Sequence, residues 1–300
     1  MDYDDAVAAF FQPSPAGSVP GPVADGSPAR RLRDAIEPIA MHSVWSRTVN
    51  EALAGEGLDF LTGYVWGRAA LLGEPTSGVA AAAFAVFEPG MVDAVLSEGR
   101  AACNRDRLLA VRDESTIRSL AGVLGRVDVN DVATTLRGAV GDADGVGRPL
   151  FSGLRDQPWP DDPIGVLWRS CEMLREHRGD SHVAVCASRG LDAVAMNILT
   201  ELWVGMPLGS YTATRGWSPE AIAASASRLR DAGWLDGNEL SAAGRRVRDD
   251  IEATTDDLEA GVVEAFGGDL DAVLSQLSDW SERCVAAGAF PPDVYKRAAG

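Results

Sequence analysis

Apolar residues recur at helical spacing along most of the chain. Leu32, Ile36 and Ile39 begin the first stripe, and similar stripes follow one another as far as Val140. Residues three and four apart share one face of an α-helix, so this spacing predicts a series of helices. The alternation of apolar and polar residues that indicates strands is not evident there, so we predict a mainly α fold rather than a sheet-rich one.

Two stretches predict more specific features. Val79 to Phe87 is almost wholly apolar and rich in alanine, which suits a helix buried on all sides. Farther on, a helix that opens at or near Pro163 is expected to end near Gly179, with Asp180 or Ser181 as the cap of the next helix. Residues 177–180 (His-Arg-Gly-Asp) would then form a corner between two helices.

The last third of the chain contains a recognisable order of elements. Ser218-Pro219-Glu220 has a cap, a first-turn proline and an acid, which predicts the start of a helix ending at Gly233. Residues 234–240 centre on Asp-Gly, which suits a two-residue hairpin turn, and Ser241 then caps a long helix. A helix, a small hairpin and a helix in this order predict a winged helix-turn-helix unit.

These elements predict an organisation in five segments. They are a flexible leader with a short helix (1–28), a helical domain (29–146), a helical connector with the His-Arg-Gly-Asp corner (147–190), a winged helix-turn-helix unit (191–260) and C-terminal helices (261–300).

Several segments of the chain resemble those of known protein families. The run from Ser218 to Asp236, followed by residues 239–245 (Glu-Leu-Ser-Ala-Ala-Gly-Arg), resembles the recognition helix, wing and following helix of MarR-type regulators. Residues 147–151 (Gly-Arg-Pro-Leu-Phe) and 174–184 resemble a largely uncharacterised actinobacterial family of helix-turn-helix proteins of about this length. The resemblance implies an all-helical front half and a winged-helix back half, and it implies no established activity.

Charge and composition narrow the function. The chain has 27 Lys and Arg against 44 Asp and Glu, a net charge of −17, so bulk attraction to nucleic acid or anionic lipid is weakened, although a locally basic face stays open. Four widely spaced cysteines suit free thiols in a reducing cytosol. No stretch approaches the roughly 20 apolar residues of a membrane span, and the N-terminus is acidic. We therefore expect a soluble cytoplasmic protein without a membrane partner.

The chemistry for DNA recognition is sparse. Six arginines and ten acids between Arg215 and Ala260 give this segment a net charge of −4. Base and phosphate contacts usually come from Arg, Lys, Asn or Gln, so affinity would depend on few cations and on a possible homodimer that doubles the site. The candidate DNA-binding residues are Arg215, Ser225, Arg228, Arg230 and Arg245.

A second group of residues suggests a small-molecule site. The candidate ligand-binding residues are His42, Tyr64, Arg68, Trp159, Arg175, His177, Asp180 and His182. Aromatic residues with arginine and histidine suit a ligand pocket, but the same residues also suit an ordinary core and helix caps that pair internally. His177 and His182 lie five apart, unlike the i, i+4 spacing of a helix-borne metal pair, so no metal site is assigned.

Two functional hypotheses remain open. No nucleophile elbow, phosphate-binding glycine loop or dinucleotide fingerprint is present, so no catalytic residue or cofactor is predicted and an enzyme has no positive support. The first hypothesis is a winged-helix transcriptional regulator, with DNA and a small-molecule ligand or protein as partners. The alternative is a small-molecule- or metal-binding protein, possibly enzyme-like, that uses the winged helix as a scaffold.

Overall fold

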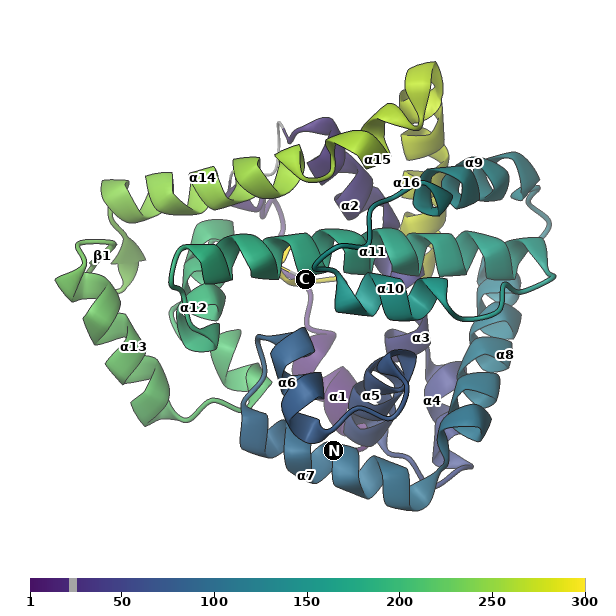
Figure 1. Cartoon of the computed structure of the whole chain (residues 1–300), viewed down its shortest axis with the longest axis horizontal. Helices are drawn as coiled ribbons and strands as arrows, with labels where there is room; N and C mark the ends of the chain where they lie inside the picture. Colours follow the sequence, from purple (N-terminus) through teal and green to yellow (C-terminus); the bar gives the residue numbers. More distant parts are fainter. Residues whose placement is uncertain (22–25, 300) are drawn as a thin grey trace.

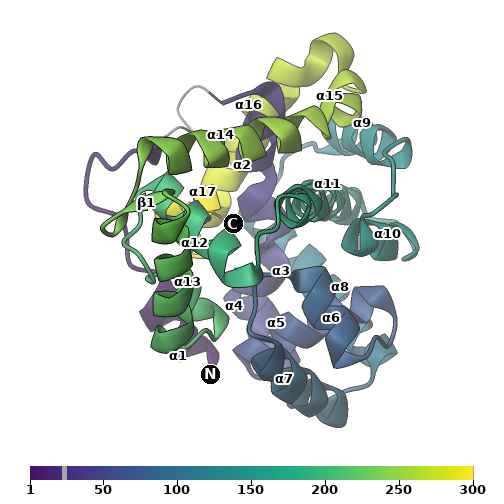
Figure 2. The same cartoon turned by 60° about the vertical axis from the view of Figure 1, so that its left-hand side comes forward.

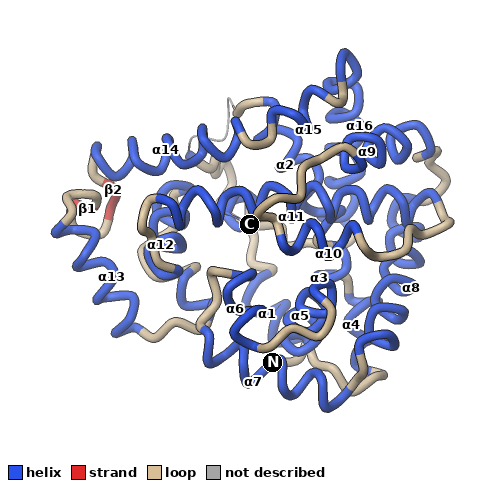
Figure 3. The backbone as a smooth tube through the Cα atoms, viewed as in Figure 1, coloured by secondary structure: helices blue, strands red, loops and turns tan. Residues whose placement is uncertain are grey.

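The computed structural model describes residues 1–21 and 26–299, and the predicted mainly α fold is confirmed (Figures 1 and 3). The first half comprises α1 (Tyr3–Phe10), α2 (Pro28–Ala40), α3 (His42–Trp45), α4 (Arg47–Ala54), α5 (Phe60–Ala69), η2 (Ala70–Leu72), α6 (Ser77–Phe84), α7 (Pro89–Ala102), α8 (Arg105–Leu124) and α9 (Asn130–Gly141). The second half comprises α10 (Pro149–Arg155), α11 (Pro163–Ser188), α12 (Ala193–Val204), η3 (Thr212–Arg215), α13 (Pro219–Asp231), β1 (Leu235–Asp236), β2 (Glu239–Leu240), α14 (Ala242–Asp257), α15 (Ala260–Glu264), η4 (Gly267–Asp269), α16 (Leu270–Ala286) and α17 (Val294–Ala299).

The long helix α11 runs through the middle of the molecule and packs against α2, α8, α9, α10 and α14 (Figure 1). Three hydrophobic clusters form around it. One joins α2, α8, α9, α11 and α16, a second lies among α4, α5, α6 and α7, and a third joins the end of α11 to α12, α13 and α14. Because α16 returns to pack on α2, segments far apart in the sequence share one core.

The continuity of α11 corrects the predicted corner at residues 177–180. The side chain of Asp162 caps the helix at Ile164 N, and the helix continues unbroken through Gly179 to Ser188. A glycine inside a helix costs about 1 kcal/mol relative to alanine. Tertiary packing of the buried residues on both sides of Gly179 outweighs that cost, and the chain turns only at Gly190, where φ is +73°.

The alanine-rich segment is also less buried than its composition suggests. Its helix, α6, ends at Phe84, and only Ala80 and Phe84 are buried, while the side chain of Val79 is exposed. The helix packs on α7 along one side, so small residues face solvent on the other. Ala85 follows with φ of +59°, a left-handed conformation that is unfavourable for a residue with a Cβ.

The predicted leader carries α1, which starts earlier than the short helix expected around residues 6–11. The Tyr3 hydroxyl donates to Trp45 O at 2.6 Å, and the rings of Phe10 and Phe11 meet the Trp45 ring edge-on. Residues 22–25 of this segment lie outside the described residues.

Helices α12 and α13, the hairpin and α14 follow one another in the predicted order. Ser218 caps α13 and Ser241 caps α14, each through its hydroxyl. Leu235 pairs with Leu240 across the antiparallel hairpin. Turning the molecule keeps α13 and the hairpin at its periphery (Figures 1 and 2).

The four cysteines are buried and free. Within residues 1–21 and 26–299, no single helix is long and apolar enough to cross a membrane, and one strongly bent pair, Pro163–Ser188 with Ala193–Val204, meets the length and composition requirement only when combined.

Candidate functional site

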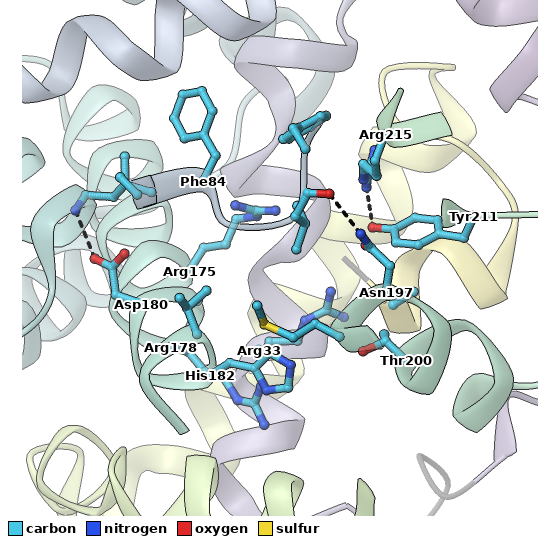
Figure 4. A pocket seen from close by; sticks show the side chains of 18 of the residues that line it. Arg33, Phe84, Arg175, Arg178, Asp180, His182, Asn197, Thr200, Tyr211 and Arg215 are labelled. Atoms are coloured by element: carbon cyan, nitrogen blue, oxygen red, sulfur yellow. Dashed lines mark hydrogen bonds between the residues drawn. The ribbon is translucent and has the colours of Figure 1, made fainter. Parts of the chain in front are cut away.

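A cavity of about 140 Å³ lies where the front helices meet α12, η3 and α14. Its wall is unusually rich in guanidinium groups. The arginines that line it are Arg30, Arg33, Arg68, Arg175, Arg178, Arg215 and Arg248. Asp180 is the one acidic side chain among the described residues of the lining, so the surface offered to a ligand is strongly positive. Figure 4 shows side chains from several elements converging on this space.

Carboxylates behind the wall hold many of these guanidiniums in place. Glu252 accepts from Arg30 at 3.2 Å, from Arg178 at 2.6 Å and from Arg248 at 2.7 Å. Burial alone would raise the pKa of the Glu252 carboxyl, but the three guanidiniums hold that pKa well below its usual range. The cluster is therefore ionised and held by several hydrogen bonds, and the Glu252 carboxylate is not part of the cavity lining.

A second ion-pair cluster holds Arg68 and Arg175, two further arginines of the lining. Arg68 donates two hydrogen bonds to Glu176, at 2.9 and 2.6 Å, and Arg175 lies between Glu176 and Glu37. Burial opposes ionisation of Glu176, yet the charges of Arg68 and Arg175 lower its pKa. Bidentate pairing restricts guanidinium orientation, so these side chains are preorganised.

Arg215 differs from the other arginines of the cavity. It donates to the Tyr211 hydroxyl, and its guanidinium stacks on the rings of Tyr211 and Phe87 at 4.2 and 5.0 Å from their centroids. It forms no ion pair with a carboxylate within residues 1–21 and 26–299. Its guanidinium therefore contacts two aromatic rings and a phenol hydroxyl in place of a carboxylate.

The cavity also joins the front helices to the helix-turn-helix elements. Val86 O, just after the strained Ala85, accepts from Asn197 Nδ2 at 2.8 Å and from Trp217 Nε1 at 2.9 Å. Glu88 N donates to Arg215 O at 2.9 Å. The α6–α7 connection is thus tied to α12 and to the segment that leads into α13.

The structure brings together five of the residues singled out as ligand-binding candidates. Tyr64, Arg68, Arg175, Asp180 and His182 all line the cavity. The imidazole of His182 is half-buried, and desolvation lowers its pKa to about 3, so it is neutral near pH 7.

The other three candidates lie elsewhere and have structural contacts. His42 Nε2 pairs with Ser119 Oγ at 2.9 Å, and burial lowers the His42 pKa to about 4. Trp159 lies under the guanidinium of Arg137. His177 Nδ1 contacts Glu259 Oε2 at 2.7 Å.

The histidines do not assemble a metal centre. Among the described residues, no group of three or more His, Cys, Asp or Glu side chains is placed to hold a metal ion.

Asp180 lines the cavity and also caps the start of a helix. Its Oδ2 accepts from the backbone nitrogens of Leu150 and Phe151, at 2.9 and 3.0 Å, and so satisfies the start of α10. Burial raises the pKa of Asp180 from 3.8 to about 7. Because the folded-state pKa is the higher one, ionisation of Asp180 lowers stability as pH rises from about 4 to about 7.

We expect Asp180→Ala to lower the free energy of unfolding by about 1–3 kcal/mol, because it leaves two buried backbone N–H groups without an acceptor. Asp180→Asn keeps an acceptor oxygen and removes the ionisation, so its stability relative to the wild type should rise between about pH 5 and about pH 8. Urea unfolding of both variants at these two pH values measures this. Equal stabilities of the alanine and asparagine variants at both values would contradict the capping role.

The DNA-binding candidates are divided among three kinds of position: the protein surface, the core and the cavity. Arg228 and Arg230 on α13 and Arg245 on α14 are exposed. Ser225 is buried on the inner side of α13, where its hydroxyl is not available to a nucleic acid, and Arg215 lines the cavity instead.

Several residues of the cavity were not anticipated from the sequence. Arg30, Arg33, Arg178 and Arg248 come from three helices that carry five other arginines, and no local pattern distinguishes a buried arginine from a solvated one. Arg178 was adjacent to predicted residues, and the i, i+3 spacing of Arg175 and Arg178 is the one signal that could have identified it.

The helix-turn-helix family matches residues 29–291, which is most of the chain. No curated protein and no solved structure is significantly similar to it. With helices α12 and α13 and the following hairpin in place, the chain belongs to the helix-turn-helix family.

Proposed function

We propose that this protein is a MarR-like winged-helix transcriptional regulator of the cytoplasm, which binds DNA as a homodimer and senses a ligand through its front helices. The family assignment supports DNA binding in general. The single observation that carries the proposal is the exposure of α13 at the periphery, directly followed by the β1–β2 hairpin (Figure 2). In winged-helix proteins these two elements are the recognition helix and the wing.

The cations available on this surface are few but accessible. Arg228 pairs with Asp192 at 2.6 Å, and both side chains are more than half exposed. Such exposed pairs contribute little to stability, so Arg228 is free to exchange its carboxylate for a phosphate. Arg245 is exposed in the first turn of α14, which follows the hairpin in the sequence.

Arg230 has a different role, because it connects the recognition helix to the wing. Its Nε donates to Gly237 O at 2.7 Å, and its Nη2 donates to Asn238 Oδ1 at 3.1 Å. Replacing Arg230 would therefore disturb the hairpin as well as remove a charge, which makes Arg228 and Arg245 the cleaner test of DNA contact.

We expect the wild-type protein to shift its native upstream DNA at low salt, with an affinity that falls as salt rises. Arg228→Ala combined with Arg245→Ala should weaken binding about tenfold or more, because two phosphate or base contacts are lost. The measurement is a mobility-shift titration over a series of salt concentrations.

Arg118→Ala is the matched control for this titration. Arg118 is 60% exposed against 59% for Arg228 and also pairs with a carboxylate, Glu114, but it lies on α8 away from α13 (Figure 1). Absence of any shift by the wild type, even at the lowest salt, would remove the regulator proposal.

The alternative function is a small-molecule-binding protein in which the winged helix is only a scaffold. The observation that favours it is the contrast between the arginine-lined cavity and the outer face of α13, where Glu220 and Asp231 accompany Arg228 and Arg230. Ligand binding by a protein that fails to shift DNA would select this alternative.

A further inference from the structure

The cavity contains buried donors that lack acceptors. Arg178 Nε, Arg215 Nε and Arg248 Nε are buried and make no hydrogen bond within residues 1–21 and 26–299. Arg178 and Arg248 are 8% and 4% exposed, so water has little access to them. Buried polar groups in proteins are nearly always hydrogen-bonded, and unmet donors at one cavity indicate a ligand that brings acceptors.

The charge of the wall specifies the sign of that ligand. The carboxylates that hold the guanidiniums, such as Glu252 and Glu176, are not part of the lining. A ligand in the cavity would therefore contact the arginines and not these carboxylates. Arg215 contributes a charge that no carboxylate among the described residues balances. The one lining acid, Asp180, is bound to backbone N–H groups and is readily protonated. These features favour an anion.

The rest of the lining specifies the body of the ligand. Phe84 and Phe87 form an aromatic wall with Tyr64 and Tyr211, and Met196 and Val183 add apolar surface. In Figure 4, Arg175 lies beneath Phe84, and Arg215 with Tyr211 closes the side where Asn197 lies. Guanidinium groups and aromatic side chains therefore line one cavity that is partly open to solvent.

We propose that this cavity binds a small organic anion, a carboxylate or phosphate ester with an aromatic or apolar body. Its acidic oxygens accept from the guanidiniums, with Arg215 as the residue that decides affinity, and its body packs against Phe84 and Phe87. A cavity of about 140 Å³ excludes a polynucleotide or a folded partner. The proposal names the ligand class for the sensing part of the proposed function and does not depend on DNA binding.

Isothermal titration calorimetry of the full-length protein, without DNA, tests the proposal with phenyl phosphate and benzoate as probes and benzyl alcohol as the neutral comparison. We expect at least one of the two anions to bind and benzyl alcohol to bind much more weakly. Arg215→Met should weaken anion binding about tenfold or more, because charge-assisted hydrogen bonds are lost. Arg215 forms no ion pair with a carboxylate among the described residues, so this variant leaves no acid unpaired and removes only the contacts of the guanidinium with Phe87 and Tyr211.

Arg118→Met, at an exposed position of α8, is the matched control and should bind as the wild type does. Thermal unfolding with and without the bound anion gives a second measurement, in which the wild type should be stabilised more than the Arg215 variant. Failure of both anions to bind at millimolar concentration, equal binding of benzyl alcohol, or unchanged affinity of the Arg215 variant would each overturn the proposal. The mobility shift of the free protein decides separately whether the regulator function stands.

Discussion

Replacing Glu252 by alanine is expected to lower the free energy of unfolding by about 3–5 kcal/mol, the largest effect among our predictions. Glu252 is buried and accepts from Arg30, Arg178 and Arg248. Removing its carboxylate leaves Arg248 without an ionic partner among the described residues, in surroundings that exclude water. A buried charge without a counterion is costly, because its lost hydration is no longer offset.

Asp250→Ala is the control for this prediction. Asp250 is an exposed carboxylate on the same helix, α14, so its removal should change stability by no more than about 0.5 kcal/mol. Chemical denaturation of both variants provides the comparison. A Glu252 variant that unfolds at the same denaturant concentration as the Asp250 variant would show that the arginine cluster does not depend on this carboxylate.

Gly244→Ala is expected to lower the free energy of unfolding by about 3 kcal/mol and to disturb the hairpin. The added methyl group has no space, because the backbones of Gly244 and Trp234 are in close contact. A Cβ at Gly244 would lie 1.9 Å from Trp234 O and 2.8 Å from the carbonyl carbon of Trp234. Ser241 holds the same junction, donating from its hydroxyl to Gly233 O at 2.6 Å and from its backbone to Trp234 O at 3.0 Å. Moving Trp234 away from Gly244 would therefore break the hydrogen bonds that Ser241 makes at the start of α14.

Gly138→Ala in α9 is the opposite case and serves as the control. Gly138 is exposed, a Cβ there meets nothing within 4 Å, and the substitution should raise stability by about 0.5–1 kcal/mol. Denaturant unfolding measures both variants, and hydrogen exchange of residues 234–240 reports on the hairpin. Normal protection of the hairpin in the Gly244 variant would contradict the close approach.

The sequence predicted the helix-turn-helix elements because the caps and the turn that start and end them depend on residues close together in the chain. Ser218 and Ser241 cap helices through their own hydroxyls, and the turn at Gly237 uses a φ of +59°, which glycine adopts at no steric cost. Gly244 belongs to the Leu-Ser-Ala-Ala-Gly run on which the resemblance to MarR-type regulators rests. The structure explains why this position is a glycine, because a Cβ there would collide with the backbone of Trp234.

The same local reasoning was wrong at Gly179 and at residues 79–87. At Gly179 a helix-breaking preference was overcome by packing of the buried residues around it. The apolar composition of α6 did not lead to burial. This short helix packs against α7 on one side, and its other side faces solvent. Local composition does not specify which side of a helix finds a partner.

The candidate ligand site was only partly predictable. Tyr64, Arg68 and Arg175 were singled out for their residue types, and they do line the cavity. His42 and His177 were singled out on the same grounds, but their contacts are with Ser119 and Glu259. The residue type alone does not separate a lining position from a core position.

The sequence by itself determined the helical class, the caps and turns of the last third and the scarcity of cations on α13, because each depends on residues close together in the chain. Only the tertiary structure decided that Arg30, Arg215 and Arg248 surround one cavity, since these residues are brought together from α2, η3 and α14. The burial of Arg30 and Arg248 is possible because the carboxylate of Glu252, from a distant segment in the case of Arg30, offsets the lost hydration, a balance that exists only once the helices have packed.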